Sequence, residues 1–392
     1  MSQAPSWDVY GFSERLTAAE KTVLDELRTT LTEKVYPYLN DAWHEDRLPE
    51  EIIEPLQSLR LMSPPALEEA GESVRGVFES MRTFELARCD TNVATFFNAQ
   101  AGLFRTVVKQ GGSAEQVAEL DPKIVNYELL GVFALTEPDH GSDVAGGLQT
   151  TASQNDDGTW TINGAKRWIG GAFQADVLWT FARDTADNQV KAFLVPREAE
   201  GVSLEKIERK ASLRIMQNAD IYYDNVQVPG DARLLNINSF RDVAKCLRLL
   251  RSDVSWIAAG AMAGAYEAAV RYTTNREQFG KPIAGFQLIQ EKLATMLGNV
   301  TASVALAMQL TEQQDAGVYK DENSALAKMF TASKLRETVA LAREVCGGNG
   351  ITLDTDVARF HADAEAVYSY EGTHEINALI VGRAITGQSA FV

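Results

Sequence analysis

The sequence predicts a mainly α-helical protein with a β domain in its middle, because the spacing of apolar residues changes twice along the chain. Apolar residues recur at helical spacing through residues 18–127. From about residue 131 they alternate in short stretches rich in β-branched and aromatic residues, as in strands. Helical spacing returns from about residue 237. We therefore predict an N-terminal helical domain, a β domain and a C-terminal helical domain over residues 1–130, 131–236 and 237–392.

The individual elements follow from the same patterns. Helices are predicted in "AAEKTVLDELRTTLTEKVYPYL", "VRGVFESMRTFELARCD" and "ATFFNAQAGLFRTVVKQ". Strands are predicted in "VFALT", "WTINGAKRWI", "ADVLWTFARD", "VKAFLVPRE" and "ADIYYDNVQVP", with turns at "NDDG" and at Asn163–Gly164. The last block predicts one long helix that ends at Asn275, followed by helices over 286–315, 321–346 and 374–386.

Composition excludes several classes of protein. The 392 residues include 54 acidic and 37 basic side chains, for a net charge of −17, which argues against a nucleic-acid-binding surface. The four histidines lack metal-site spacing, and the three cysteines are widely spaced, as in a reducing compartment. No run approaches the roughly 20 apolar residues of a membrane span, and the first 20 residues are polar and acidic, without the apolar core of a signal sequence. We expect a cytoplasmic protein without a stable membrane anchor.

The stretch "VYSYEGTHEINALIVGRAITG", residues 367–387, allows two interpretations. Thr373 could simply cap a helix whose apolar stripe includes Ile376 and Ile380. Alternatively, Glu371 could be a carboxylate held in an apolar pocket, where it would move a proton. The spacing alone favours the cap.

Four other motifs are each modest. The loop in "FALTEPDHGSD" (133–143) could bind a heterocycle edge or a phosphate, or could be an ordinary polar loop. In "RWIGG" (167–171) the glycines permit close approach of a planar ligand, although core packing of Trp168 is the simpler interpretation. "NREQFGKPI" (275–283) ends a helix and could supply Arg276 to a pyrophosphate. "GGNG" (347–350) is a helix stop and only a weak dinucleotide signal.

Taken in register, "FALTEPDHGSD", "KRWIG", "NREQFGKPI", "VCGGNGI" and "YEGTHEINALIVGRAITG" resemble the acyl-CoA dehydrogenase family. The resemblance is strongest to the branch that holds glutaryl-CoA dehydrogenases and plant short-chain acyl-CoA oxidases. It implies a helical N-terminal domain, a middle β-barrel domain and a C-terminal four-helix bundle. It also implies FAD as cofactor, an acyl-CoA substrate, an electron-transfer flavoprotein as electron acceptor, and a homotetramer built as a dimer of dimers.

The resemblance assigns roles residue by residue. Glu371 would remove the α-proton of the thioester while the β-hydrogen leaves as hydride to the flavin, and Arg251 would orient the base. Enclosure by the ligand and Tyr370 should raise the pKa of Glu371. The residues expected to bind FAD are Phe133, Leu135, Thr136, Gly141, Ser142, Trp168, Ile169, Gly170, Arg276, Gln278, Phe279, Gln287, Glu344, Gly347, Gly348 and Thr373. Those expected to bind substrate are Ser142, Phe96, Phe97, Arg248, Arg251 and Gly372.

Some relatives carry the base on the long helix, at the place of Leu250, which cannot serve here. Asp253 is the nearby carboxylate, and we interpret it as structural.

Departures from the family pattern bear on the substrate and the acceptor. Ala94 stands where the glutaryl branch has a carboxylate-binding arginine, which predicts a non-decarboxylating enzyme. Gly170 replaces a usual threonine, as in the plant oxidases, so an acyl-CoA oxidase that passes electrons to O₂ stays open. "RIMQNAD" (214–220) lacks the usual serine and threonine, and Glu344 replaces a glutamine. A catalytically silent flavin-binding member and a helical scaffold without cofactor are the remaining alternatives.

Overall fold

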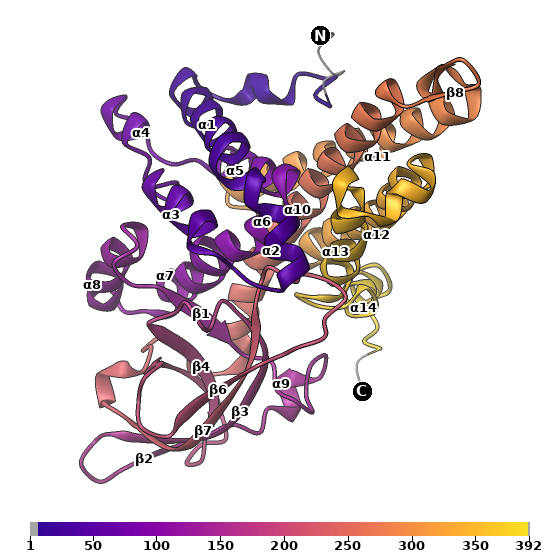
Figure 1. Cartoon of the computed structure of the whole chain (residues 1–392). Coiled ribbons are helices and arrows are strands. Elements are labelled where there is room, and N and C mark those ends of the chain that lie inside the picture. Colours follow the sequence, from indigo (N-terminus) through magenta and orange to yellow (C-terminus); the bar gives the residue numbers. More distant parts are fainter. Residues whose placement is uncertain (1–6, 391–392) are drawn as a thin grey trace. The chain divides into compact units, whose positions relative to one another are not determined.

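The computed structural model describes residues 7–390, which form two compact units. We call the first the helical unit; it comprises the chain up to residue 95, residues 211–215, and the chain from residue 251 onward. The second, which we call the sheet unit, comprises residues 96–210 and 216–250. Figure 1 shows the elements of both units.

The first block of the chain is helical, as predicted. Helix α1 (Ala18–Thr30) begins at Thr17, whose side chain accepts from the Glu20 N–H while the Glu20 carboxylate accepts from the Thr17 N–H. The helices that follow are α2 (Leu39–Glu45), α3 (Glu50–Ser58), α4 (Pro65–Glu69), α5 (Gly76–Cys89), α6 (Thr91–Asn98), α7 (Arg105–Gly111) and α8 (Ala114–Val125). The last two belong to the sheet unit.

The strands of the sheet unit curl around one apolar core (Figure 1). They are β1 (Gly131–Ala134), β2 (Thr151–Gln154), β3 (Trp160–Gly170), β4 (Val177–Asp184), β5 (Val190–Pro196), β6 (Val202–Lys206) and β7 (Asn218–Val228), with the short helix α9 (Val144–Gly147) before β2. Their order is β1-β4-β2-β3-β7-β6, and β5 pairs with β4. The β1–β4 and β2–β4 pairs are parallel and the others antiparallel. Alternating burial along β7 reflects a sheet with one face on the core.

The tight turn predicted at Asn163–Gly164 is wrong. Both residues lie inside β3, where the pairing with β7 shifts register between Ile162 and Gly164. Gly164 has φ +143°, and a Cβ there would come within 2.6 Å of the Thr150 Oγ1. The glycine therefore serves a bulge with close backbone approach, which the sequence does not distinguish from a hairpin turn.

The C-terminal block consists of long helices, as predicted. They are α10 (Phe240–Asn275), α11 (Gln287–Asp315), α12 (Asp321–Val345), α13 (Val357–Ser369) and α14 (His374–Thr386). A two-strand hairpin of β8 (Glu277–Gln278) and β9 (Lys281–Pro282) separates α10 from α11. Within the helical unit α12 packs against α11, α13 and α14. Gly260 lets α10 approach α5 closely, because a Cβ there would lie 2.3 Å from the Phe84 carbonyl oxygen.

Helix α11 has the length and apolar composition needed to cross a membrane, which the sequence analysis did not expect. About half of its most apolar window, 44%, is buried inside the protein. The buried residues of α11 include Val300, Val304 and Met308, and the helix packs on α12 and α5. A core helix of a soluble bundle meets the same criterion, so this finding is weak evidence for a membrane span.

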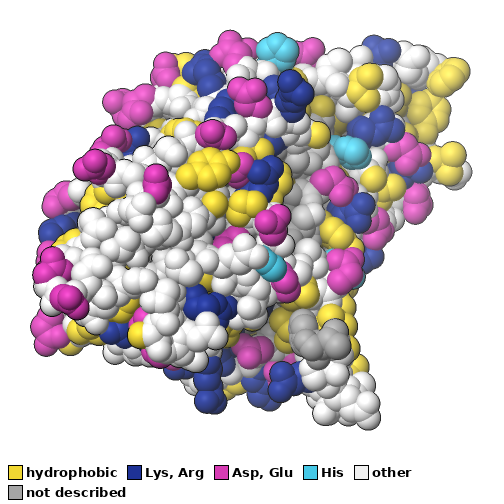
Figure 2. Space-filling model, turned by 90° about the horizontal axis from the view of Figure 1, so that it is seen from below, with side chains coloured by type: hydrophobic (Ala, Val, Ile, Leu, Met, Phe, Trp, Pro, Cys, Tyr) yellow, Lys and Arg dark blue, Asp and Glu magenta, His cyan; other side chains and the backbone are white. Residues whose placement is uncertain are grey.

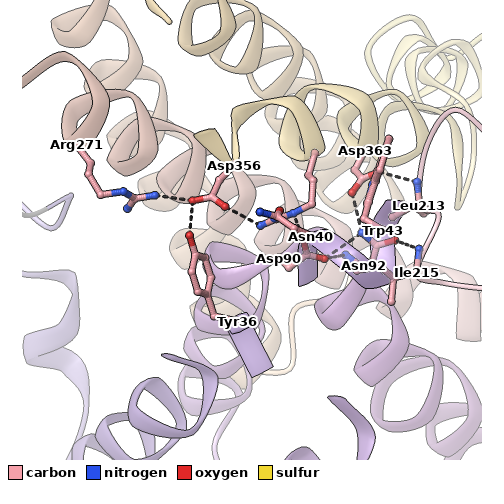
Figure 3. A network of polar contacts seen from close by, with 11 residues as sticks. Tyr36, Asn40, Trp43, Asp90, Asn92, Leu213, Ile215, Arg271, Asp356 and Asp363 are labelled. Carbon is pink, nitrogen blue, oxygen red and sulfur yellow. Dashed lines mark hydrogen bonds and ion pairs between the residues drawn. The ribbon is translucent and has the colours of Figure 1, made fainter. Parts of the chain in front are cut away.

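A buried polar network anchors α13, the helix that leads to Glu371 (Figure 3). The Asp363 carboxylate is fully buried and accepts hydrogen bonds from the Leu213 N–H, the Trp43 indole and the Asn92 amide, at 2.6, 3.2 and 2.7 Å. One turn earlier on α13, Arg359 forms ion pairs with Asp90 and Asp356. These contacts tie the first half of α13 to α2, α6 and residues 211–215, and so hold in place the helix that precedes the Glu371 turn.

Candidate active site

The turn between α13 and α14 carries the candidate base in a strained conformation. Glu371 has φ +50° and Gly372 has φ +89°, so both lie in the left-handed region. Such a conformation is unfavourable for glutamate and persists only where the surroundings impose it, most often at functional sites. Thr373 then caps α14 by accepting from the Ile376 N–H at 3.3 Å. The predicted cap is confirmed, and it stands directly beside an unusual glutamate.

Two buried side chains impose this turn. The Lys328 ammonium, fully buried on α12, donates to the Tyr368 carbonyl at 2.8 Å and to the Gly372 carbonyl at 2.9 Å. The Asn377 amide, also fully buried, donates to the Gly372 and Thr373 carbonyls at 2.8 and 3.0 Å. The backbone on both sides of Glu371 is therefore held by donors from two helices.

Burial raises the pKa of Glu371 to about 8, and the negative charge of Asp253 adds to this rise. The positive charges of Lys328 and Arg251 oppose it. The Glu371 Oε2 atom is buried and has no hydrogen-bond partner among the described residues. The expected rise in pKa is thus present. It brings the pKa of the carboxyl close to the working pH, where a general base is most effective.

Arg251 and Asp253 lie on α10 in the same surroundings. Burial lowers the pKa of Arg251, against the effect of the Asp321 and Glu371 charges. Its Nε atom lies 3.8 Å from where a Cβ on Gly372 would stand, and no described residue accepts its hydrogen bond. Burial and Glu79 raise the pKa of Asp253 to about 7. Asp253 therefore acts on the charge state of Glu371, a role that the sequence analysis did not give it.

Lys328 is the residue of this site that sequence reasoning missed. Ser324, Lys328, Thr331 and Leu335 are all fully buried and share one face of α12 at helical spacing. A lysine on a buried face requires polar partners. The position of Lys328 on an otherwise apolar or small-residue face of the predicted helix was the signal in the sequence that could have identified it.

A pH-dependent stability difference follows from the raised pKa of Glu371. A carboxyl with a folded pKa near 8 binds more protons in the native state than in the unfolded state, so it lowers stability as the pH rises from about 4.5 to about 8. Glutamine does not titrate. We expect Glu371→Gln to melt at least about 2 °C above wild type at pH 8, with the gap closing below pH 5. Thermal unfolding across pH 4–9 measures the gap, and a gap that is constant with pH would contradict the assignment.

In the sheet unit, the candidate cofactor loop is anchored by a buried ion pair. The Lys166 ammonium on β3 is fully buried and donates to the Glu137 carboxylate at 2.8 Å and to the Leu135 carbonyl at 3.1 Å. The Glu137 carboxylate also accepts from the Gln149 and Thr150 N–H groups at 2.6 and 2.9 Å. These bonds fix both ends of the loop that carries Thr136, Gly141 and Ser142.

The residues predicted to contact a flavin in this unit differ in exposure. Leu135 and Ile169 are buried, Phe133 and Thr136 are partly buried, and Gly141 and Ser142 are exposed. The interpretation of Trp168 as a core residue is wrong, because its side chain is 52% exposed at φ +65°, with the Arg167 guanidinium 5.0 Å from its ring centre. The bulge that shifts the β3–β7 register just before Ile169 turns the indole outward.

The remaining candidates of the sheet unit lie at its beginning and end. Phe96 and Phe97 on α6 are buried, and the Phe96 ring reaches 3.9 Å from where a Cβ on Gly171 would stand. Arg248 on α10 is partly buried.

A third group of candidates surrounds the β8–β9 hairpin in the helical unit. Arg276, Gln278 and Gln287 are exposed, and no described residue pairs with the Arg276 guanidinium. Phe279, at the tip of the hairpin with φ +52°, is 93% exposed. Exposed at the end of α12 are Gly347 and Gly348, where a Cβ would meet nothing, and Glu344, which forms a 3.3 Å ion pair with Lys292.

These side chains fit a flavin dinucleotide. An unpaired arginine suits a pyrophosphate, exposed aromatic rings suit planar rings, and the open glycines permit backbone approach. Among residues 7–390, no three His, Cys, Asp or Glu side chains lie together as metal ligands. Acidic and basic side chains are interspersed over the face shown in Figure 2, without a continuous basic patch.

Comparisons with known proteins identify the family. Three family models match, described as the N-terminal, middle and C-terminal domains of acyl-CoA dehydrogenase, over residues 17–128, 132–226 and 240–386. The boundaries that we drew at 130/131 and 236/237 remain predictions. An acyl-CoA dehydrogenase of Bacillus subtilis is 31% identical over 348 residues, which cover 87% of this chain and 91% of that protein.

Two solved structures show the same fold. The glutaryl-CoA dehydrogenase of Mycobacterium smegmatis in complex with FADH2 is 30% identical with a TM-score of 0.91, over 98% of this chain and 99% of that one. The butyryl-CoA dehydrogenase of Megasphaera elsdenii is 29% identical with a TM-score of 0.88, over 94% and 98%. The chain therefore belongs to the acyl-CoA dehydrogenase family, as an FAD-dependent enzyme that dehydrogenates acyl-CoA on the family's three-domain fold.

Proposed function

We propose that this protein oxidises an acyl-CoA thioester to the trans-2-enoyl-CoA, with Glu371 as the base that removes the α-proton. The observation that carries the proposal is the state of Glu371. Its backbone is strained, the pKa of its carboxyl is raised, and its Oε2 atom has no hydrogen-bond partner among the described residues. A structural carboxylate would be paired. An unpaired one that the protein holds in place is available to a substrate proton.

The surrounding residues divide the remaining work. Arg251, partly buried beside Gly372, orients the Glu371 carboxylate and opposes its protonation. Gly372 leaves space for the thioester, and the Glu371 N–H can donate to its carbonyl oxygen, where negative charge develops as the proton leaves. When bound, FAD supplies the acceptor for the β-hydrogen and its electron pair. The exposed loop with Gly141 and Ser142, together with Trp168, would hold the flavin ring.

The hairpin group would hold the rest of the cofactor. Arg276 is free to bind the pyrophosphate, while Gln278, Phe279 and Gln287 offer amides and an aromatic face for the adenosine. The exposure of Phe279 and of Leu288 suits a contact with a second copy of the chain, in line with a homotetramer. In this proposal, the enzyme is cytoplasmic and passes its electrons to an electron-transfer flavoprotein.

The substrate is proposed to carry an unbranched, apolar acyl chain. Ala94, at the place of the expected arginine clamp, is 1% exposed on α6. The distal carboxylate of a glutaryl-CoA substrate would be buried beside this alanine without a cation to pair with, which is costly. Phe96 and Phe97 are candidate walls of an apolar pocket, so we propose that the enzyme does not decarboxylate glutaryl-CoA.

A second candidate function is an acyl-CoA oxidase, favoured by the missing side chain at Gly170. A Cβ there would lie 2.5 Å from the Met216 methyl carbon and 3.3 Å from the Asn218 amide nitrogen. Met216 is 2% exposed and fills the space that a threonine side chain would take. The Met216 side chain therefore occupies the space that the missing threonine would leave beside Gly170, which supports the dehydrogenase.

An absorbance spectrum of the purified holoenzyme tests the two functions. The protein is mixed anaerobically with a straight-chain acyl-CoA and then opened to air. Bleaching that persists in air supports the dehydrogenase. Rapid recovery with peroxide would establish the oxidase instead, and a yellow protein that no thioester bleaches would overturn both proposals.

The packing of Met216 predicts how oxygen reactivity responds to substitution. We expect Met216→Ala to speed reoxidation in air, because it removes the side chain that fills the space over Gly170. Gly170→Thr in the Met216→Ala background should restore slow reoxidation, since the threonine refills that space. Stopped-flow reoxidation of the reduced enzyme measures both rates. Equal rates in all three proteins would show that this packing does not control oxygen access.

A further inference from the structure

Lys328 is a buried cation beside the candidate base, and it takes no part in the steps proposed for Glu371, Arg251 and Gly372. We propose that Lys328 is a positioning residue for proton abstraction: its ammonium group holds the Tyr368–Gly372 turn in its strained conformation, and its charge favours the ionised form of the Glu371 carboxyl. The inference rests on the proposed function, because it assumes that Glu371 is the base.

The contacts of Lys328 are unusual for a buried lysine. Its side chain is fully buried, yet no carboxylate in the described chain lies within 4.0 Å of its nitrogen. Its two hydrogen bonds go to backbone carbonyls, those of Tyr368 and Gly372. Lysines are almost never fully buried unless paired. The Lys328 ammonium is therefore a desolvated charge, and its hydrogen bonds hold the backbone on both sides of Glu371.

Holding this backbone fixes where the base points. Glycine adopts a left-handed φ readily, but a glutamate does not keep one unless its surroundings hold it there. The Lys328 nitrogen bonds the carbonyls three residues before and one residue after Glu371, so it clamps the turn from one atom. Asn377 shares the Gly372 carbonyl but not that of Tyr368. Lys328 thus provides the contact that spans the turn.

The charge of Lys328 acts on the same group. The titratable groups that act on Glu371 and Lys328 are Arg251 and Asp253 from α10 and Glu375 from α14. Burial and Asp253 favour the protonated carboxyl, while Lys328 and Arg251 favour the ionised one, with Lys328 the larger of the two. Burial in turn lowers the pKa of Lys328 to about 8, against the effect of the Glu371 charge. Without Lys328, a smaller fraction of the carboxyl would be ionised at neutral pH, and fewer enzyme molecules could accept the substrate proton.

The experiment compares holoenzymes carrying Lys328→Met, Lys328→Gln and Lys328→Arg. Methionine removes charge and donor, glutamine keeps one donor without charge, and arginine keeps both. The control is Lys334→Met, which breaks an exposed ion pair with Glu337 on the same helix. For each protein, the rate of flavin bleaching by acyl-CoA is measured from pH 5 to pH 10.

We expect the acidic limb of the profile to move up by at least about one pH unit in Lys328→Met and Lys328→Gln, which is about a tenfold loss of rate at pH 7. Lys328→Arg and Lys334→Met should keep the wild-type limb. A purely structural lysine would lower the rate equally at every pH. An acidic limb at the wild-type pH in both uncharged variants would overturn the proposal. If Lys328→Met does not fold, the result for Lys328→Gln alone is decisive.

A second readout avoids activity. The pH dependence of the melting-temperature gap between Glu371→Gln and its parent reports the pKa of Glu371 through linkage. In the Lys328→Gln background, the pH at which the gap levels off should rise by the same amount as the kinetic limb. Failure here differs from failure of the proposed function: if Glu371→Gln bleaches like wild type, the function is wrong, whereas an inert Glu371→Gln with unmoved limbs rejects Lys328 alone.

Discussion

Replacing Glu371 by glutamine is expected to slow the bleaching of the enzyme by acyl-CoA by about 10²–10⁴-fold, the usual contribution of a positioned general base. Glutamine keeps the size and hydrogen-bonding reach of the side chain but cannot accept the α-proton. It also removes a desolvated carboxyl, so the variant should fold at least as well as wild type at pH 8. Loss of rate with gain of stability is the combination that identifies a catalytic carboxyl.

The matched control for this prediction is Glu365→Gln. Glu365 lies six residues before Glu371, on α13, where its exposed carboxylate pairs with Arg336, and it is the same substitution of the same residue type. Its bleaching rate should stay within about twofold of wild type, since exposed charges contribute little. Anaerobic stopped-flow absorbance measures both rates. Equal rates in Glu371→Gln and wild type would remove Glu371 from the reaction.

The sequence carried the outline of the fold because its periodicity is strong. The ends of α10, α11 and α14 follow apolar stripes and stop signals, so they fall within a residue of the predicted positions. Asn163–Gly164 was misread because a glycine at positive φ serves a bulge as readily as a turn. Which of the two forms depends on the partner strand, and that is not a local property.

Site residues that belong to short sequence motifs could be predicted from the sequence. Site residues whose role depends on burial in the fold could not. Glu371 stands beside a glycine in a motif that resembles a known family. Lys328 lies 43 residues before it on another helix, in a segment with no motif, and only the fold brings the two together. The motif around Trp168 favoured core packing, which is wrong, whereas the family resemblance assigned Trp168 to the flavin, and that assignment stays a prediction.

A second large effect is expected in the sheet unit, from Lys166→Met. This change leaves the buried Glu137 carboxylate without its cation, and breaking one side of a buried ion pair costs about 3–5 kcal/mol. Burial by itself would raise the pKa of Glu137, but the charge and hydrogen bond of Lys166 hold it below its usual value. We therefore expect a large loss of stability in chemical denaturation at pH 7, and weaker FAD binding because Glu137 anchors both ends of the cofactor loop.

The double variant Lys166→Met/Glu137→Gln separates the charge from the packing. Glutamine carries no charge but can still accept from the Thr150 N–H, so the double variant should recover part of the stability lost in Lys166→Met. Lys123→Met, which breaks an exposed pair with Glu119, is the control and should cost at most about 1 kcal/mol. If the single and double variants were equally unstable, the cost would come from lost packing of the lysine chain. The ion pair would then not be what holds the loop, and its effect on FAD binding should vanish as well.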